Sequence, residues 1–242
     1  MIPKVIHYIW LGGKELPKIA EKCIASWRKF CPEHEIKRWD ESNLDLNKYQ
    51  FVKDALDAKK YAFASDVLRT EILYNEGGIY FDIDVELINS IQDLLDKHNC
   101  VIGFETSNLL NPGLFMASEQ HNEDLCNILD IYKTLKFDVD NLTNLTICEV
   151  YTKYFEQKGL KRKNVTQEIE NTKFYASEYF SPIDVITNKK RITSNTRSIH
   201  WYNASWYTGK QKFYSRLKKV VNFCTFGLAG KLYNKVKGCK HE

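Results

Sequence analysis

In the first half of the chain, segments with the apolar pattern of a strand alternate with segments that have the apolar spacing of a helix. Residues 3–10 form an apolar run that predicts a strand, and residues 16–30 place apolar side chains at helical spacing. The pattern continues with a helix over 59–75 that ends at two glycines, and with strands over 35–39, 79–82, 101–104 and 114–117. Strands separated by helices of this length predict βαβ units and a mainly parallel sheet.

The second half of the chain is less regular. Its pattern predicts helices near 121–134 and 143–158 and then short strands to about Trp201. No internal repeat or Gly-, Pro- or Ser-rich linker divides the chain, so we expect one α/β domain over 1–207 and an extension over 208–242. The N-terminus does not have the pattern of a signal peptide, and no apolar run reaches the roughly 18 residues of a membrane span.

Charge separates the extension from the rest of the chain. Residues 208–242 carry nine Lys or Arg and one acidic residue, a net charge of +8, whereas the preceding residues sum to −4. Apolar residues recur among these charges at helical spacing: Phe213, Leu217, Val220, Val221, Cys224 and Leu228. Such a pattern favours peripheral contact with the inner face of a membrane, and the alternative is a helix packed on the domain with a solvated basic face. No nucleic-acid module is recognisable, so no nucleic-acid partner is expected.

Composition and cysteine spacing narrow the class of protein further. Hydrophobic residues make up 43% and charged residues 27% of the chain, values typical of a globular protein. The seven cysteines are scattered and form no Cys-x-x-Cys pair, which argues against a disulfide framework or a zinc knuckle. We therefore expect reduced thiols and a cytoplasmic location.

The strongest chemical signal is Asp82-Ile83-Asp84 at the end of a predicted strand. Residues i and i+2 of a strand share a face, so both carboxylates are expected to point the same way. Mg²⁺ and Mn²⁺ bind through few carboxylates together with substrate phosphates, and ligands of open α/β sheets lie at the carboxyl ends of strands. A second pair, Asp138 and Asp140, follows no apolar strand and is interpreted as a solvated helix cap.

Three further features have both a structural and a functional interpretation. Asp66 and Arg69 share a face of a largely apolar helix and form either an internal ion pair or a ligand contact. His200, in an aromatic-rich segment, is either a structural histidine or a metal ligand. Trp10 is either a core residue or a platform on which a nucleobase stacks.

Together these segments resemble glycosyltransferase family 32. The resemblance spans about residues 2–206: the run from Ile2 to Gly13, the Ala-Ser-Asp-x-x-Arg helix, Gly77–Asp84 with its Asp-x-Asp pair, and a closing His…Ser-Trp element. The family includes capsule and lipopolysaccharide enzymes, the fungal initiating α-1,6-mannosyltransferase and, more distantly, the catalytic domain of the large glucosylating toxins. The resemblance implies a GT-A fold, a Rossmann-like mixed sheet flanked by helices, and a nucleotide-sugar donor used with Mn²⁺ or Mg²⁺.

The resemblance also implies roles for individual residues. The implied catalytic residues are Asp82, Asp84 and Arg69, and the implied metal ligands are Asp82, Asp84 and His200. The implied donor contacts are Trp10, Asp66, Arg69, Tyr80, Asp82 and Asn111, with Ser205 and Trp206 on a loop that closes over the diphosphate. Retention of anomeric configuration is implied as well, so no protein base is needed; an inverting enzyme would need one, and Glu105 is the candidate.

The leading functional hypothesis is a retaining transferase, an enzyme that acts on a donor and an acceptor. It would move a hexose from a nucleotide sugar, with uridine favoured over guanosine, to a glycan or lipid-linked acceptor in surface polysaccharide synthesis. The alternatives are a toxin-like transferase that modifies protein, a non-catalytic nucleotide-sugar or glycan-binding module, and a phosphohydrolase that uses the same carboxylates.

Overall fold

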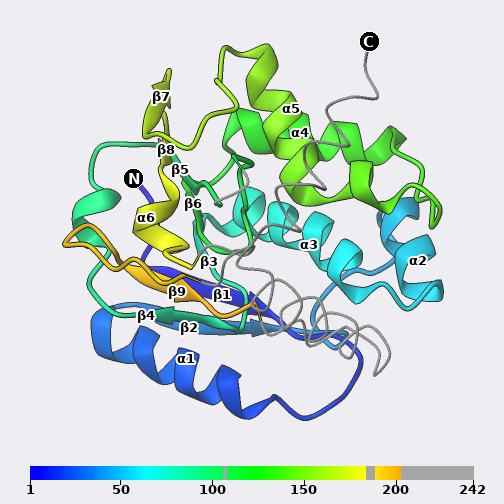
Figure 1. Ribbon diagram of the computed structural model, residues 1–242. Helices are drawn as coiled ribbons and strands as arrows, with labels where there is room; N and C mark the ends of the chain where they lie inside the picture. Colours follow the sequence, from blue (N-terminus) through cyan, green and yellow to red (C-terminus); the bar gives the residue numbers. More distant parts are fainter. Residues whose placement is uncertain (106–107, 184–188, 203–242) are drawn as a thin grey trace, which may run out of the picture.

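The computed structural model describes residues 1–105, 108–183 and 189–202. Figure 1 shows their helices and strands. In chain order these are β1 (Val5–Ile9), α1 (Lys18–Phe30), β2 (Glu35–Trp39), α2 (Gln50–Asp57), α3 (Tyr61–Glu76), β3 (Gly78–Tyr80), β4 (Val85–Leu87), η1 (Gln92–Leu94), β5 (Cys100–Gly103), β6 (Met116–Ser118), α4 (Glu123–Thr134), η2 (Leu142–Leu145), α5 (Ile147–Gln157), β7 (Gln167–Ile169), β8 (Thr172–Tyr175), α6 (Ser177–Phe180) and β9 (Ser198–His200). The predicted extension over 208–242 and the boundary at 207 lie outside the described residues.

A seven-stranded mixed sheet forms the centre of the molecule, in the order β2-β1-β3-β6-β5-β8-β7. The pairs β1–β2, β1–β3 and β5–β8 are parallel, whereas β3–β6, β5–β6 and β7–β8 are antiparallel. The mixed sheet flanked by helices is therefore confirmed, and the sheet is mainly parallel as expected, because β2, β1, β3, β5 and β8 run in one direction. Among the described strands of this sheet, only β6, which lies between β3 and β5, and the edge strand β7 run in the opposite direction.

Helices cover both faces of this sheet, α1 on one face and α2, α3, α4 and α5 on the other (Figure 1). Successive strand residues supply the two cores in turn, as the pleat of a strand requires. Ile79 and Val101 pack on the side of α1, while Tyr80 and Ile102 pack on the side of α3. Helix α3 is buried around most of its circumference, which explains why its sequence is apolar on nearly every face.

Helix α3 ends where the glycine pair predicts. Gly77 has a φ of 65°, a backbone conformation that residues with a side chain seldom adopt. A Cβ atom there would also lie 2.8 Å from Pro3 Cδ and 2.9 Å from the backbone nitrogen of Gln120. Gly77 thus lets the chain leave α3 and enter β3 directly beneath the N-terminal segment.

A two-stranded antiparallel sheet, β4 with β9, lies beside the main sheet. The elements β4, α2 and η1 are not expected from the sequence, α6 is a helix where short strands are expected, and the predicted strand over 79–82 ends at Tyr80. All of the missed elements are short, and the three residues of β4 are too few to display a period. Within the described part of the chain, no helix has both the length and the apolar character needed to cross a bilayer.

Candidate active site

The Asp-x-Asp pair lies on a turn between β3 and β4. The backbone N–H of Val85 donates to the carbonyl of Asp82 at 3.0 Å and closes this turn. The expected strand geometry for Asp82 and Asp84 is therefore wrong, because the strand stops two residues earlier. The turn nevertheless brings the two carboxylates together at the carboxyl end of β3.

Asp82, Asp84 and His200 converge at this turn. One ligand atom from each lies within 4.8 Å of the others, and His200 Nε2 is 3.2 Å from Asp84 Oδ1. Pairing of β4 with β9 explains the approach, because Val85 lies opposite His200 and the N–H of Trp201 donates to the carbonyl of Asp84 at 3.0 Å. The predicted ligand set is thus brought to one place by a sheet that the sequence pattern did not reveal.

This donor set fits a divalent cation. Ligands in octahedral coordination at about 2.1 Å stand roughly 3–4 Å apart, so a small closure of the three groups suffices. Asp84 and His200 are both buried. Burial alone lowers the pKa of His200, but the carboxylates of Asp84, Asp82 and Glu105 together outweigh it and the pKa is raised above its usual value. A cation between the two groups would take the place of that proton.

Arg69 joins the Asp-x-Asp turn to helix α3. Its guanidinium lies 3.1 Å from Asp82 Oδ1 and 3.1 Å from Asp66 Oδ1, and it stacks over the ring of Tyr80 at 4.6 Å. Burial disfavours its charge, but Asp82, Tyr80 and Asp66 together raise the pKa of Arg69. A permanently charged guanidinium is thus fixed beside the first aspartate of the pair.

Asp66 serves both the structure and this charge cluster. Its Oδ2 atom accepts a hydrogen bond of 3.3 Å from the N–H of Ile147, the first residue of α5, where the helix dipole favours a negative charge. Burial raises the pKa of Asp66 to about 7, against the opposing effect of Arg69. Burial also raises the pKa of Asp82, although Arg69 opposes it and the Tyr80 hydroxyl donates to Asp82 Oδ1 at 3.2 Å.

A tight turn at Asn111–Leu114 packs against Arg69 and Asp82. Asn111 Oδ1 accepts from the N–H of Gly113 at 2.9 Å, and its amide donates to Glu105 Oε2 at 3.0 Å. The carbonyl of Gly113 in turn accepts from the N–H of Asp82 at 2.8 Å. Asn111, expected to face the sugar, therefore has both ends of its side chain engaged by the protein.

Gly113 is the site residue that sequence reasoning missed. A Cβ atom at this position would lie 2.5 Å from Arg69 Nη1 and closer still to Asp82 Oδ2. The backbone thus runs directly against the Arg69–Asp82 ion pair, an approach that only glycine permits. The sole sequence signal was a Pro-Gly turn after a buried strand, which is common in proteins without such a site.

Trp10 lies at the same edge of the sheet. It follows β1, which runs parallel to β3 with His7 opposite Tyr80, so Trp10 and Asp82 both follow the carboxyl ends of neighbouring strands. Its indole N–H donates to the carbonyl of Lys14 at 2.6 Å and the side chain is partly exposed. This position suits stacking on a ligand but does not test it.

The remaining predicted residues are placed as follows. Ser205 and Trp206 lie outside the described residues. Asp138 and Asp140 are exposed, and the N–H of Asp140 donates to Asp138 Oδ1 at 2.9 Å just before η2. The second Asp-x-Asp pair is thus solvated as expected, but its interpretation as a helix cap is wrong, because η2 has Asn141 at its N-cap and no side-chain cap.

Comparison with known proteins identifies the class of this site. Residues 17–101, which include Asp66, Arg69 and the Asp-x-Asp turn, match the family model for the glycosyltransferase sugar-binding region containing a DXD motif. The chain is a DXD-containing glycosyltransferase. No curated protein sequence matches it, and the narrower placement in family 32 stays a prediction.

Solved structures show that the glycosyltransferase fold extends beyond the matched segment. The chain is similar to the PaToxG glycosyltransferase, with a TM-score of 0.54 and 21% identity over 65% of this chain and 70% of that one. It is also similar to a glycosyltransferase involved in the glycosylation of the major capsid of PBCV-1, with a TM-score of 0.51 and 12% identity over 89% of this chain and all of that one. Identities this low show a shared fold, and the mixed sheet flanked by helices is GT-A-like.

Proposed function

We propose that this glycosyltransferase is metal-dependent and moves a hexose from a uridine diphosphate sugar to a hydroxyl group of a glycan or lipid-linked acceptor, in surface polysaccharide synthesis. The observation that carries the proposal is the convergence of Asp82, Asp84 and His200 within 4.8 Å. These residues would hold Mn²⁺ or Mg²⁺, which when bound supplies a Lewis acid for the charge that develops on the leaving diphosphate.

Arg69 supports the same chemistry without proton transfer. Transfer breaks the bond between the anomeric carbon and a phosphate oxygen, and that oxygen gains negative charge as the bond lengthens. Two carboxylates and the Tyr80 ring fix the guanidinium before the reaction begins. A preorganised positive charge at the developing anion lowers the barrier because it needs no reorganisation at that moment.

Asp66 and Trp10 are proposed to contact the two ends of the donor. Asp66 accepts hydrogen bonds beside Arg69 and is the candidate for the sugar hydroxyls. Trp10 is the candidate for the nucleobase, because it is a partly exposed aromatic ring at the sheet edge where the Asp-x-Asp turn lies. Open α/β sheets bind their ligands at the carboxyl ends of the strands, where Trp10 and the Asp-x-Asp turn both lie.

The stereochemical course is proposed to be retention. In a front-face reaction the leaving phosphate oxygen takes the proton of the acceptor hydroxyl, so the protein supplies no base. Glu105 is the candidate base if the enzyme inverts, since its carboxylate lies close enough to raise the pKa of His200. Proton NMR of the anomeric centre during turnover separates the two courses, and an inverted product whose formation is lost in Glu105→Gln would give the base role to Glu105.

The test of the proposed function is release of uridine diphosphate by the purified full chain. A panel of UDP- and GDP-sugars is supplied with Mn²⁺, with Mg²⁺ or with a chelator. We expect release with a UDP-hexose that depends on the divalent cation. Equal release in the presence of chelator would refute metal dependence, and release of inorganic phosphate without sugar transfer would instead favour the phosphohydrolase.

A further inference from the structure

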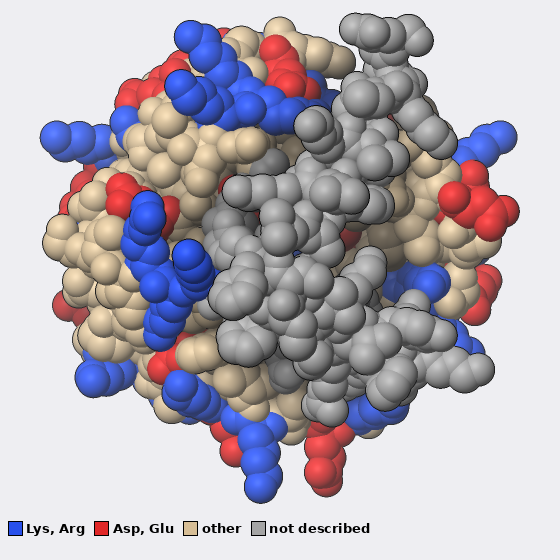
Figure 2. Space-filling model, viewed as in Figure 1, with Lys and Arg blue, Asp and Glu red and all other residues tan. Residues whose placement is uncertain are grey.

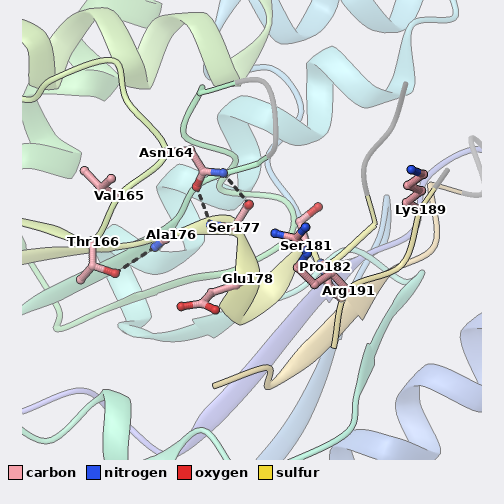
Figure 3. Close-up of a pocket in the computed structure, with 10 residues that line it drawn as sticks. All are labelled: Asn164, Val165, Thr166, Ala176, Ser177, Glu178, Ser181, Pro182, Lys189 and Arg191. Atoms are coloured by element: carbon pink, nitrogen blue, oxygen red, sulfur yellow. Dashed lines mark hydrogen bonds between the residues drawn. The ribbon is translucent and has the colours of Figure 1, made fainter. Parts of the chain in front are cut away.

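A polar cavity lies beside α6 (Figure 3). Its volume is about 630 Å³. Three segments line it: the loop before β7, the stretch from the end of β8 through α6, and the chain that returns toward β9. The lining residues are Asn164, Val165, Thr166, Ala176, Ser177, Glu178, Ser181, Pro182, Lys189 and Arg191.

One wall of the cavity is fixed by hydrogen bonds. Asn164 Oδ1 accepts from the N–H of Ser177 at 2.7 Å, and its amide donates to the Ser177 hydroxyl at 2.6 Å. Thr166 Oγ1 accepts from the N–H of Ala176 at 3.2 Å (Figure 3). Side chains already held in place lose little conformational entropy when a ligand binds, so this wall is preorganised.

The charged groups of the cavity favour an anion. The Glu178 carboxylate accepts from Thr193 Oγ1 at 3.2 Å and from Asn195 Nδ2 at 3.1 Å, which directs it to the loop before β9. Lys189 and Arg191 supply two positive charges, and no carboxylate of the described residues forms an ion pair with Arg191. Figure 2 shows Lys and Arg side chains gathered on the side of this face where α6 and β9 lie.

Tyr202 connects the cavity to the proposed metal site. Its hydroxyl is 2.8 Å from Ser181 Oγ in the cavity lining, and its ring packs on His200 with the ring centroids 4.1 Å apart. Tyr202 has a φ of 48°, a conformation that bulky residues seldom adopt without surrounding contacts. The Tyr202 side chain thus spans from the cavity lining to His200, while Arg69 and Asp66 lie on the Asp82 side of the cluster.

We propose that this cavity is the acceptor subsite and that it takes a saccharide carrying a carboxylate or a phosphate group. The inference rests on the proposed function and names its acceptor class. The polar wall formed by Asn164, Thr166 and Ser177 binds the sugar hydroxyls, and Lys189 and Arg191 bind the acidic group. This places the acceptor on the His200 side of the transferred sugar. There the acceptor oxygen bonds to the anomeric carbon, the bond from that carbon to the diphosphate breaks, and the hydroxyl proton passes to the leaving phosphate.

Binding of simple sugars to the full chain tests the proposal. The probes are methyl β-D-glucuronide, glucose 6-phosphate and neutral methyl β-D-glucoside, titrated by saturation-transfer NMR with and without UDP and Mn²⁺. We expect at least one acidic probe to bind about tenfold or more tightly than the neutral glucoside, because charge-assisted hydrogen bonds are the stronger ones. The tighter acidic probe distinguishes a carboxylate from a phosphate acceptor.

Charge-reversal variants test whether the acidic probes bind in this cavity. The variant with Lys189→Glu and Arg191→Glu should lose the acidic preference, and Arg28→Glu on α1 should keep it. Equal binding of all three probes, absence of binding, or an acidic preference that survives the double substitution would overturn the proposal. UDP binding in the presence of Mn²⁺, measured on the same samples, tests the proposed function separately. If UDP does not bind, the donor site is refuted, and the titrations without nucleotide still test sugar binding in the cavity.

Discussion

Replacement of Gly113 by alanine is the sharpest test of how the fold supports catalysis. The new Cβ atom would lie 2.5 Å from Arg69 Nη1 and nearer to Asp82 Oδ2, whereas unstrained non-bonded contacts begin near 3.5 Å. Either the turn or the ion pair must therefore move by about 1 Å. The carbonyl of Gly113 also accepts from the N–H of Asp82 at 2.8 Å, so a shift of the turn moves Asp82 as well.

A displacement of that size has a large effect on activity. Misplacement of a reacting group by about 1 Å costs roughly 10²-fold in rate, and overpacking costs about 1–3 kcal/mol of unfolding free energy. We expect Gly113→Ala to remain folded and to lose roughly 10²-fold in kcat/KM with a UDP-hexose. The concentration of Mn²⁺ needed for half-maximal activity should rise too, because Asp82 is a proposed metal ligand.

Gly103→Ala is the matched control. Its Cβ atom would lie 2.5 Å from Leu114 Cδ1 and 3.0 Å from Phe180 Cδ2, a similar overlap with apolar atoms in place of a charge pair. Urea denaturation should show comparable destabilisation of the two variants, with activity per folded molecule largely kept in the control. If Gly113→Ala keeps wild-type activity, or if both variants lose the same fraction, the positioning role of Gly113 is refuted.

Four other outcomes are expected. Asp84→Asn should reduce sugar transfer at least about 100-fold with an unchanged circular dichroism spectrum; wild-type transfer would remove the metal role of Asp84. Trp10→Ala should weaken UDP binding in calorimetry more than it slows turnover, and unaltered affinity would contradict base stacking. Burial lowers the pKa of His7 to about 4, so its folded-state pKa lies below the unfolded value. Stability should therefore fall as the pH drops from about 6.5 toward 4, and His7→Gln, compared in urea denaturation at pH 5 and 7, should reduce that loss; an equal loss would show that other groups cause it. Deletion of 208–242 should reduce co-sedimentation with anionic liposomes, and equal pelleting would end the proposal of peripheral membrane contact.

The contacts of His7 explain its neutral state. Its Nε2 atom lies 2.9 Å from the carbonyl of Gly77, which only accepts, and its Nδ1 atom accepts from the Trp39 indole N–H at 3.0 Å. Protonation of Nδ1 would break the bond to Trp39. Because Gly77 leads directly into β3, this histidine helps fix the strand that carries the Asp-x-Asp turn.

Local signals in the sequence were sufficient for several features of the site. Asp66 and Arg69 are three residues apart on one helix, so the spacing alone predicts that their side chains meet, and they lie 3.1 Å apart. The glycine pair after that helix predicts its end, and the apolar run that follows predicts a buried strand. These features are decided by neighbours along the chain, through periodicity and through backbone conformations that glycine favours.

The tertiary structure alone decided which distant groups meet. β4 and β9 have three residues each, too few to show an alternating pattern, yet their pairing brings His200 to Asp84. The approach of Gly113 to Arg69 and Asp82, and the contact of Tyr202 with Ser181, likewise join segments far apart in the sequence. A sequence pattern records whether a position is buried but not which side chain buries it, because packing partners are selected by the three-dimensional arrangement of the elements. The sequence therefore determined the chemistry of the Asp-x-Asp turn and its neighbouring helix, and the fold determined the approach of His200, the glycine beneath the ion pair and the cavity beside α6.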